Sequence, residues 1–266
     1  MIQILKTGKE FWLWGVVIAA GLLVFLLLPG AAPDKSRAVL HGLCAQTPSH
    51  SFNFGGTLLP FDGRMTGIYG GSIITIASLI ASRRVLFYGN PPIRIVIALA
   101  LGVGSMAVDG LNSLLTDLHL WHPYESQNEL RLITGYLTGM ALGIGLSWLL
   151  GSSMWRMSRP DAGVDRFLVL LVPVGLFLPY AGAVMSGWTF LLMPLTFFLM
   201  AAAWITLTML MLVVVLLIFR YEDQIASIAQ LQIPGLVASA LALAIMLGLA
   251  GGRFWLERSL GMPSLL

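Results

Sequence analysis

Long intervals without any Asp, Glu, Lys or Arg divide the chain. They are 11–33, 65–82, 95–108, 132–155, 167–219 and 224–252. A helix needs about 20 apolar residues to cross the hydrocarbon core of a bilayer, so the fifth interval is too long for a single span. Ser186-Gly187-Trp188 supplies a turn signal in the middle of that interval. The pattern therefore predicts seven transmembrane helices.

The predicted spans have boundaries that are set by these intervals and by their flanking polar residues. They are 11–30, 65–82, 93–114, 131–152, 167–186, 190–219 and 232–252. Composition agrees with this assignment, because 58% of the residues are hydrophobic and only 10% are charged, outside the range of soluble domains. We expect an all-α, polytopic integral membrane protein in which residues 1–266 form a single membrane domain.

The distribution of basic residues predicts the orientation. With the N-terminus in the cytoplasm, nine of the 15 Lys and Arg residues lie on the inside and six on the outside, as the positive-inside rule favours. We therefore expect a multi-pass protein of the cell membrane with a cytoplasmic N-terminus. The net charge of +3 comes from scattered residues and not from a dense basic stripe, which argues against nucleic acid as a partner.

Two predicted outer loops, roughly 31–64 and 115–130, contain all four histidines of the chain. The spacings His41-x-x-Cys44 and His119-x-x-His122 can place two ligand atoms on one metal, and imidazole and thiolate suit zinc, copper or iron. The alternative is that these are ordinary polar residues of interfacial loops. The candidate ligands of a transition metal on the outer face are His41, Cys44, His50, Asp62, His119 and His122.

Asp109 lies inside an otherwise apolar predicted helix, near its outer end. An ionisable group in the membrane is unfavourable unless it is paired or hydrated. Arg64 and Arg131, at the outer ends of two other spans, are the available partners, and Asn112 can extend the network from the same helical face. Two interpretations stay open: an ion pair that fixes helix packing, or a functional polar site.

Gly135, Gly139 and Gly143 follow one another at intervals of four residues on one face of the fourth predicted span. Small residues at this spacing let two helix backbones approach closely. We expect packing between helices of this chain, and the alternatives are dimerisation or contact with a pigment or lipid.

Three blocks of sequence resemble a known family. The blocks are Cys44–Phe52 with Pro60–Tyr69, then Asp109-Gly110-Leu111-Asn112, then Glu125–Gly135. They are similar to the uncharacterised membrane family with domain of unknown function 2085. The resemblance implies a family-like core over 38–150, with an additional C-terminal three-helix segment over 165–252.

The chain departs from the family pattern at its thiols. The resemblance implies a histidine after the first cysteine, where this chain has Ala45, and a Cys-x-x-Cys pair, where it has Asp62 and Met65. Only Cys44 corresponds to a family cysteine. The resemblance therefore does not imply thiol chemistry for this chain.

Three functions are compatible with these patterns. The loss of thiols and the lack of a recognisable catalytic motif favour a non-catalytic binding or accessory subunit of a larger membrane complex, of the respiratory or photosynthetic kind, with other membrane subunits and the lipid bilayer as partners. A membrane-embedded metal-dependent enzyme or factor would use the outer histidines. A small-solute or ion transporter would use Asp109, with Pro173, Pro179 and Pro194 interrupting two helices beside a cavity.

Overall fold

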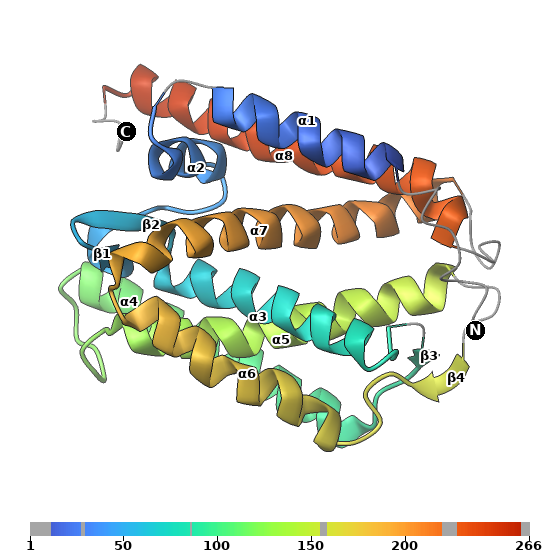
Figure 1. The fold of residues 1–266 in the computed structure, drawn as a ribbon. Helices are drawn as coiled ribbons and strands as arrows, with labels where there is room; N and C mark the ends of the chain where they lie inside the picture. The colour runs from blue at the N-terminus through green and yellow to red at the C-terminus, as the bar shows by residue number, and fades with distance from the viewer. Residues whose placement is uncertain (1–11, 28–29, 86, 155–158, 220–227, 262–266) are drawn as a thin grey trace.

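A computed structural model describes residues 12–27, 30–85, 87–154, 159–219 and 228–261. The chain is mostly helical (Figure 1), which confirms the predicted all-α class. The α-helices are α1 (Trp12–Leu27), α2 (Ala32–Leu40), α3 (Gly63–Ala81), α4 (Ile93–Asp117), α5 (Asn128–Met154), α6 (Leu168–Met185), α7 (Thr189–Ile218) and α8 (Gln232–Ser259). Short 3-10 turns lie at Pro48–His50 and Ile228–Leu231.

Six of the described helices, α3 to α8, are long and apolar enough to cross a membrane. The predicted number of seven is not met by this measure. The described part of α1 has 16 residues, which span about 24 Å at 1.5 Å per residue and fall short of a hydrocarbon core about 30 Å thick. Residues 11, 28 and 29, which belong to the first predicted span, lie outside the described residues. The chain is a polytopic membrane protein with at least these six candidate spans.

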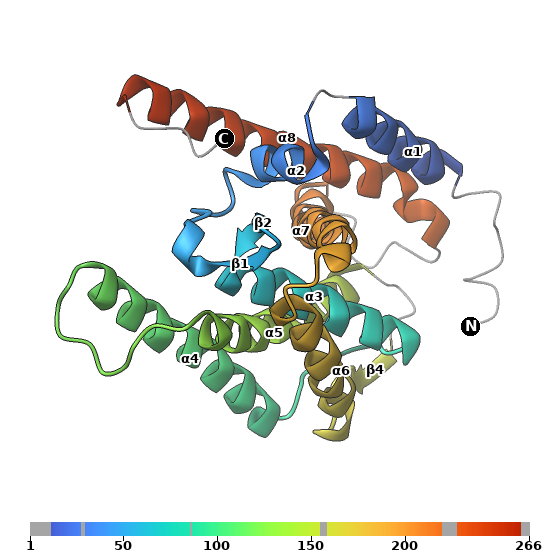
Figure 2. The same ribbon diagram turned by 60° about the vertical axis from the view of Figure 1, so that its left-hand side comes forward.

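Helices α3 and α5 form the centre of the bundle and lie side by side (Figures 1 and 2). A Cβ atom at Gly143 would lie 2.8 Å from the backbone oxygen of Ser72. At Gly135 and Gly139 a Cβ would lie even closer to backbone oxygens of α3. The three predicted packing glycines thus face α3, where only a hydrogen atom fits between the backbones.

The remaining helices surround this pair, with α7 against α3, α8 against α7, and α4 against α5 (Figure 2). Tyrosines join α6 to the centre: Tyr136 donates to the backbone oxygen of Pro173 at 2.6 Å, and Tyr180 donates to that of Thr66 at 2.8 Å. Pro173 and Pro179 lie inside α6, and Pro194 lies inside α7. Both helices continue through their prolines.

A β-hairpin closes one end of the bundle. Strand β1 (Ser51–Phe54) pairs antiparallel with β2 (Thr57–Asp62). Gly55 and Gly56, with φ of 60° and 94°, form the two-residue turn, and positive φ at both positions matches the twist of a hairpin. The sequence interpretation treated 31–64 as a loop, and the structure replaces much of it with α2 and this hairpin.

The opposite end carries a parallel pairing of β3 (Phe87–Gly89) with β4 (Arg159–Ala162) (Figure 1). Beside these strands Arg84 donates to Asp165 at 2.8 Å and to the backbone oxygen of Gly163 at 3.2 Å. Hydrogen bonds from Arg166 and Arg84 lower the pKa of the Asp165 carboxyl. The two connections at this end are therefore held together by charge as well as by backbone pairing.

Candidate functional site

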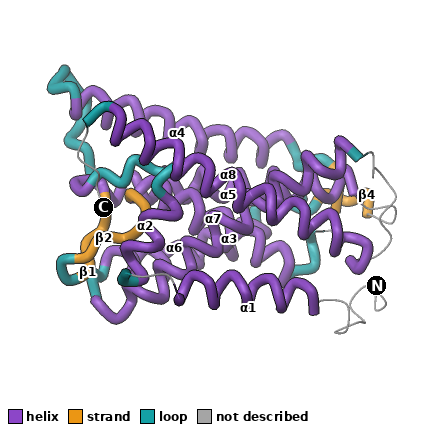
Figure 3. The backbone as a smooth tube through the Cα atoms, turned by 90° about the horizontal axis from the view of Figure 1, so that it is seen from above, coloured by secondary structure: helices purple, strands orange, loops and turns teal. Residues whose placement is uncertain are grey.

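The polar residues singled out from the sequence gather at the end of the bundle that carries the hairpin. We call the segments 31–64 and 115–130 the polar cap. Helix α4 ends here, α3 and α5 begin here, and α8 ends beside α2 (Figures 1 and 3). The topology of the bundle thus brings both predicted loops to one end.

Asp109 is the buried centre of a polar network at the base of this cap. It lies in a candidate membrane-spanning helix, and its side chain is 1% exposed. Arg64 Nη2 donates to Asp109 Oδ2 at 2.7 Å, and Tyr124 Oη donates to Oδ1 at 3.2 Å. Burial and the nearby Asp109 charge raise the pKa of Tyr124, which keeps its hydroxyl in the donor form. The buried carboxylate therefore has both a counter-charge and a neutral donor, the pairing that burial of an ion requires.

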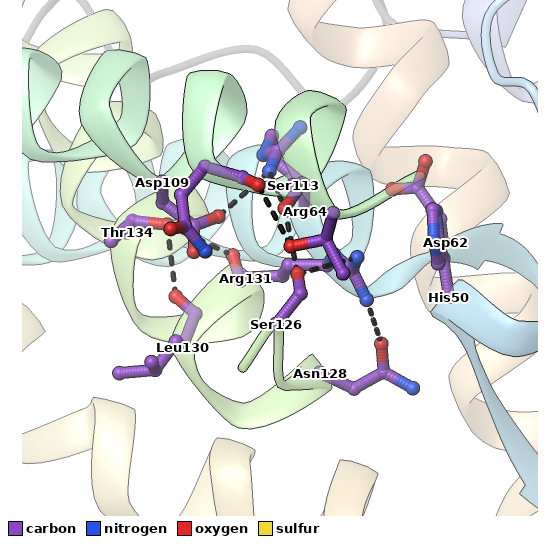
Figure 4. A network of polar contacts seen from close by, with 12 residues as sticks. His50, Asp62, Arg64, Asp109, Ser113, Ser126, Asn128, Leu130, Arg131 and Thr134 are labelled. Carbon is purple, nitrogen blue, oxygen red and sulfur yellow. Dashed lines mark hydrogen bonds and ion pairs between the residues drawn. The ribbon is translucent and has the colours of Figure 1, made fainter. Parts of the chain in front are cut away.

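Arg131 joins this network through hydroxyl groups and has no described hydrogen bond to Asp109. Its Nη2 donates to Ser126 Oγ at 2.7 Å and its Nη1 to Asn128 Oδ1 at 2.7 Å. Ser126 and Ser113 share a hydrogen bond of 2.8 Å, and Arg64 Nη2 lies 3.3 Å from Ser113 Oγ. Figure 4 shows this chain of contacts between the two guanidinium groups.

Asn112 fixes the loop that covers the network. Its Nδ2 donates to the backbone oxygen of Tyr124 at 2.8 Å, and its Oδ1 accepts from the backbone nitrogen of Tyr124 at 3.4 Å. All four residues predicted as a polar network thus lie together at the junction of α3, α4 and α5. Sequence reasoning missed Ser113, which lies one turn after Asp109, and the loop residues Tyr124 and Ser126.

His41 belongs to a second network, which joins α2 to α8. Its Nδ1 lies 3.0 Å from Gln46 Oε1, and its Nε2 lies 2.9 Å from Glu257 Oε2. Glu257 also accepts from Arg253 Nε at 2.8 Å, and Arg253 donates to the backbone oxygens of His41 and Cys44. The contacts of His41 are therefore those of a buried histidine in an internal ion-pair network.

Cys44 and Asp62 have local structural partners. Cys44 Sγ accepts from the backbone nitrogens of Gln46 at 3.3 Å and of Asp62 at 3.4 Å. Burial and the Asp62 charge raise the pKa of the Cys44 thiol to about 12, so the thiol is neutral at pH 7 and a poor nucleophile. Asp62 Oδ1 accepts from Met65 N at 2.8 Å, which caps the N-terminus of α3.

The other candidate ligands lie in separate pairs or singly. His50 Nε2 lies 3.4 Å from Asp117 Oδ1, and His122 Nε2 lies 3.3 Å from Glu125 Oε1. His119 occupies a left-handed turn after α4, with φ of 56°. In the part of the chain that the structure describes, no three His, Cys, Asp or Glu side chains come together in a group that could hold a metal ion.

Comparison with known proteins places the network in a family context. No curated protein and no solved structure matches the chain. Residues 44–145 match the family model described as predicted membrane protein (DUF2085), which confirms the resemblance inferred from the sequence blocks. This segment runs from Cys44 into α5 and includes Arg64, Asp109 and Arg131. The part of the chain that carries the polar network is therefore similar to the DUF2085 family of membrane proteins.

Proposed function

We propose that this chain is a non-catalytic binding or accessory subunit of a larger membrane complex in the cell membrane, with a cytoplasmic N-terminus and its polar cap on the outer side. The single observation that carries the proposal is the contrast within the cap. The ionisable side chains His41 and Arg64 of the cap pair with Glu257 and Asp109 of the helices beneath it, whereas the tip of the loop between α4 and α5 presents apolar side chains to the outside.

The loop tip has the features of a docking surface. Leu118, Leu120 and Trp121 are exposed, and Trp121 is 82% exposed. Figure 2 shows this loop extending beyond the ends of α4 and α5. It follows Asp117, whose charged side chain pairs with His50 and is suited to the level of the headgroups. Contiguous exposed apolar side chains are typical of sites that bind a protein or a membrane.

The base of the same loop is ordered. Both the side-chain amide and the side-chain oxygen of Asn112 bind the backbone of Tyr124, and Ser126 bonds to Ser113 on α4. A tip held on a fixed base loses less conformational freedom on binding. This arrangement supports binding of a partner protein better than it supports chemistry within the cap.

Co-purification from native membranes in mild detergent tests the proposal. The tagged chain is compared with a Leu120→Ser/Trp121→Ser variant and with Trp255→Ser as a control, because Trp255 is also exposed at the cap end of α8. We expect the chain and the control to run on native gels as one larger complex with a defined partner. The loop variant should run as a smaller species. A chain that is solitary in all three samples would overturn the proposal.

A further inference from the structure

We propose that the Arg64–Arg131 network is a binding site for a phosphate group, presented either by an anionic lipid headgroup or by free phosphate. The proposal concerns the base of the cap and is independent of the partner that docks on the loop tip. It rests on three properties of the network: its net charge, its unused hydrogen-bond donors and its access from outside.

The network carries more positive than negative charge. Arg64 and Arg131 contribute two guanidinium groups, which are always protonated, and Asp109 contributes one carboxylate. Two further carboxylates lie nearby, Asp62, which caps α3, and Asp117, which pairs with His50. None of the described carboxylates forms an ion pair with Arg131, and its charge is offset only at longer range by Asp109, Asp117 and Asp62.

The network also has a hydrogen-bond donor that no acceptor satisfies. Both described hydrogen bonds of Arg64 come from Nη2, to Asp109 and Ser113. Its Nε is buried and has no hydrogen-bond partner among the residues that the structure describes. A buried donor without an acceptor is unfavourable, and guanidinium donors match the oxygens of a phosphate in geometry and charge. An anionic oxygen group would satisfy the donor and the charge together.

Arg64 is the accessible arginine of the network, since Arg131 is only 4% exposed. The Arg64 side chain is 25% exposed, whereas Asp109 is 1% exposed. A Cβ at position 110 would lie 3.7 Å from Arg64 Nη1, so the guanidinium lies against the backbone of α4 at Gly110. Under the proposed orientation the exposed part of the Arg64 side chain lies near the headgroups of the outer leaflet. Basic sites between membrane helices at this depth suit lipid phosphates.

Thermal unfolding of the purified chain tests the site with defined probes. One arm adds inorganic phosphate in neutral detergent, with sodium chloride at matched ionic strength as the reference. The other compares nanodiscs of phosphatidylcholine with nanodiscs that also contain phosphatidylglycerol. We expect a saturable rise of Tm with phosphate in detergent, with phosphatidylglycerol in nanodiscs, or with both. A rise of Tm with phosphate in detergent would show that free phosphate is sufficient for binding. A rise with phosphatidylglycerol alone would identify the lipid headgroup as the ligand.

Variants show whether the response comes from this site. Arg64→Gln and Arg131→Gln should abolish the response, and Arg64→Lys should weaken it because lysine keeps the charge but lacks the planar fork. Arg258→Gln is the matched control, since Arg258 is exposed near the end of α8 and the charge change is the same. Equal responses in Arg64→Gln and Arg258→Gln, or no response in either arm, would overturn the proposal.

Asp109→Asn separates binding from a structural ion pair. The variant removes the carboxylate that competes for Arg64, and the half-saturating phosphate concentration should fall at least about tenfold, in the direction that loss of a nearby negative charge dictates. If the Arg64–Asp109 pair is purely structural, Asp109→Asn would lower Tm without any gain in phosphate affinity. That second result would contradict the proposal even if Arg64 variants fail to fold.

Discussion

At the residue scale, burial of the Asp109 carboxylate depends on Arg64. Asp109→Leu would leave that guanidinium without its counter-charge, and loss of one member of a buried pair destabilises by about 3–5 kcal/mol. Asp117→Leu is the control, because Asp117 is 51% exposed beside His50 and such a pair contributes only about 0–1 kcal/mol. Denaturant unfolding in detergent measures both changes. Equal losses of stability would contradict the buried-pair account.

His122 predicts a pH dependence for the loop tip. Its Nδ1 faces the backbone oxygen of Leu120 at 2.9 Å and its Nε2 faces Glu125 at 3.3 Å. These two acceptors raise the pKa of His122 above 6.5, because both ring nitrogens can donate only when the ring is protonated. The stabilisation of the loop tip by protonated His122 is therefore complete below pH 6.5 and is lost as the pH rises through the raised pKa of His122.

Trp121 lies next to His122, so its fluorescence should report this transition. The emission should change across that pH window in the unaltered chain, while His122→Asn should give no transition. A transition of the same size in the variant would assign the pH response to another group. Because the chain has several tryptophans, the difference between Trp121→Phe and the unaltered chain isolates the signal.

The individual contacts were only partly predictable from the sequence. Arg64 and Asp109 could be expected to interact because an ionisable group in a span needs a partner, but the choice between Arg64 and Arg131 depends on side-chain geometry. Glu257 could not be assigned to His41, since 216 positions separate them and no local pattern joins α2 to α8. Tyr124 and Ser126 lie in a loop, where no helical periodicity marks them.

At the scale of elements, the glycines of α5 predict a position-specific response to a single methyl group. Gly139→Ala would place a Cβ against the backbone of α3 at Ile68 and Ser72, and overpacking of this kind typically destabilises by about 1–3 kcal/mol. Gly145→Ala is the matched control on the same helix, because no atom of the described residues lies within 4 Å of its Cβ position. Unfolding in detergent compares the two variants. Similar stabilities would show that α3 and α5 are not in close contact.

The long helices could be predicted because the absence of charge over about 20 residues is a strong signal of a span. The helix α2 and the hairpin β1–β2 are shorter and contain polar residues, so the same signal cannot detect them. Gly55-Gly56 was a turn signal of the hairpin type that the interpretation as a loop left unused. The family blocks located the site segment, since residues 44–145 carry both the match and the network.

At the scale of the whole molecule, the proposed orientation predicts which positions an external reagent can reach. Cys44 is buried and should react slowly, which makes the unaltered chain a suitable background. Glu125→Cys in the cap should be labelled by a membrane-impermeant maleimide on intact cells. Arg83→Cys, at the exposed end of α3 opposite the cap, should be labelled only after lysis. Labelling of position 83 and protection of position 125 on intact cells would reverse the orientation.

Site-specific photo-crosslinking in native membranes tests the central claim, that the tip of the polar cap binds a partner protein. A photoreactive phenylalanine derivative at position 121 is compared with one at position 97, an exposed apolar position within the candidate span of α4. We predict one discrete protein adduct from position 121, containing the partner that co-purifies with the chain, and no such adduct from position 97. A chain that gives no protein adduct from position 121 would contradict the account.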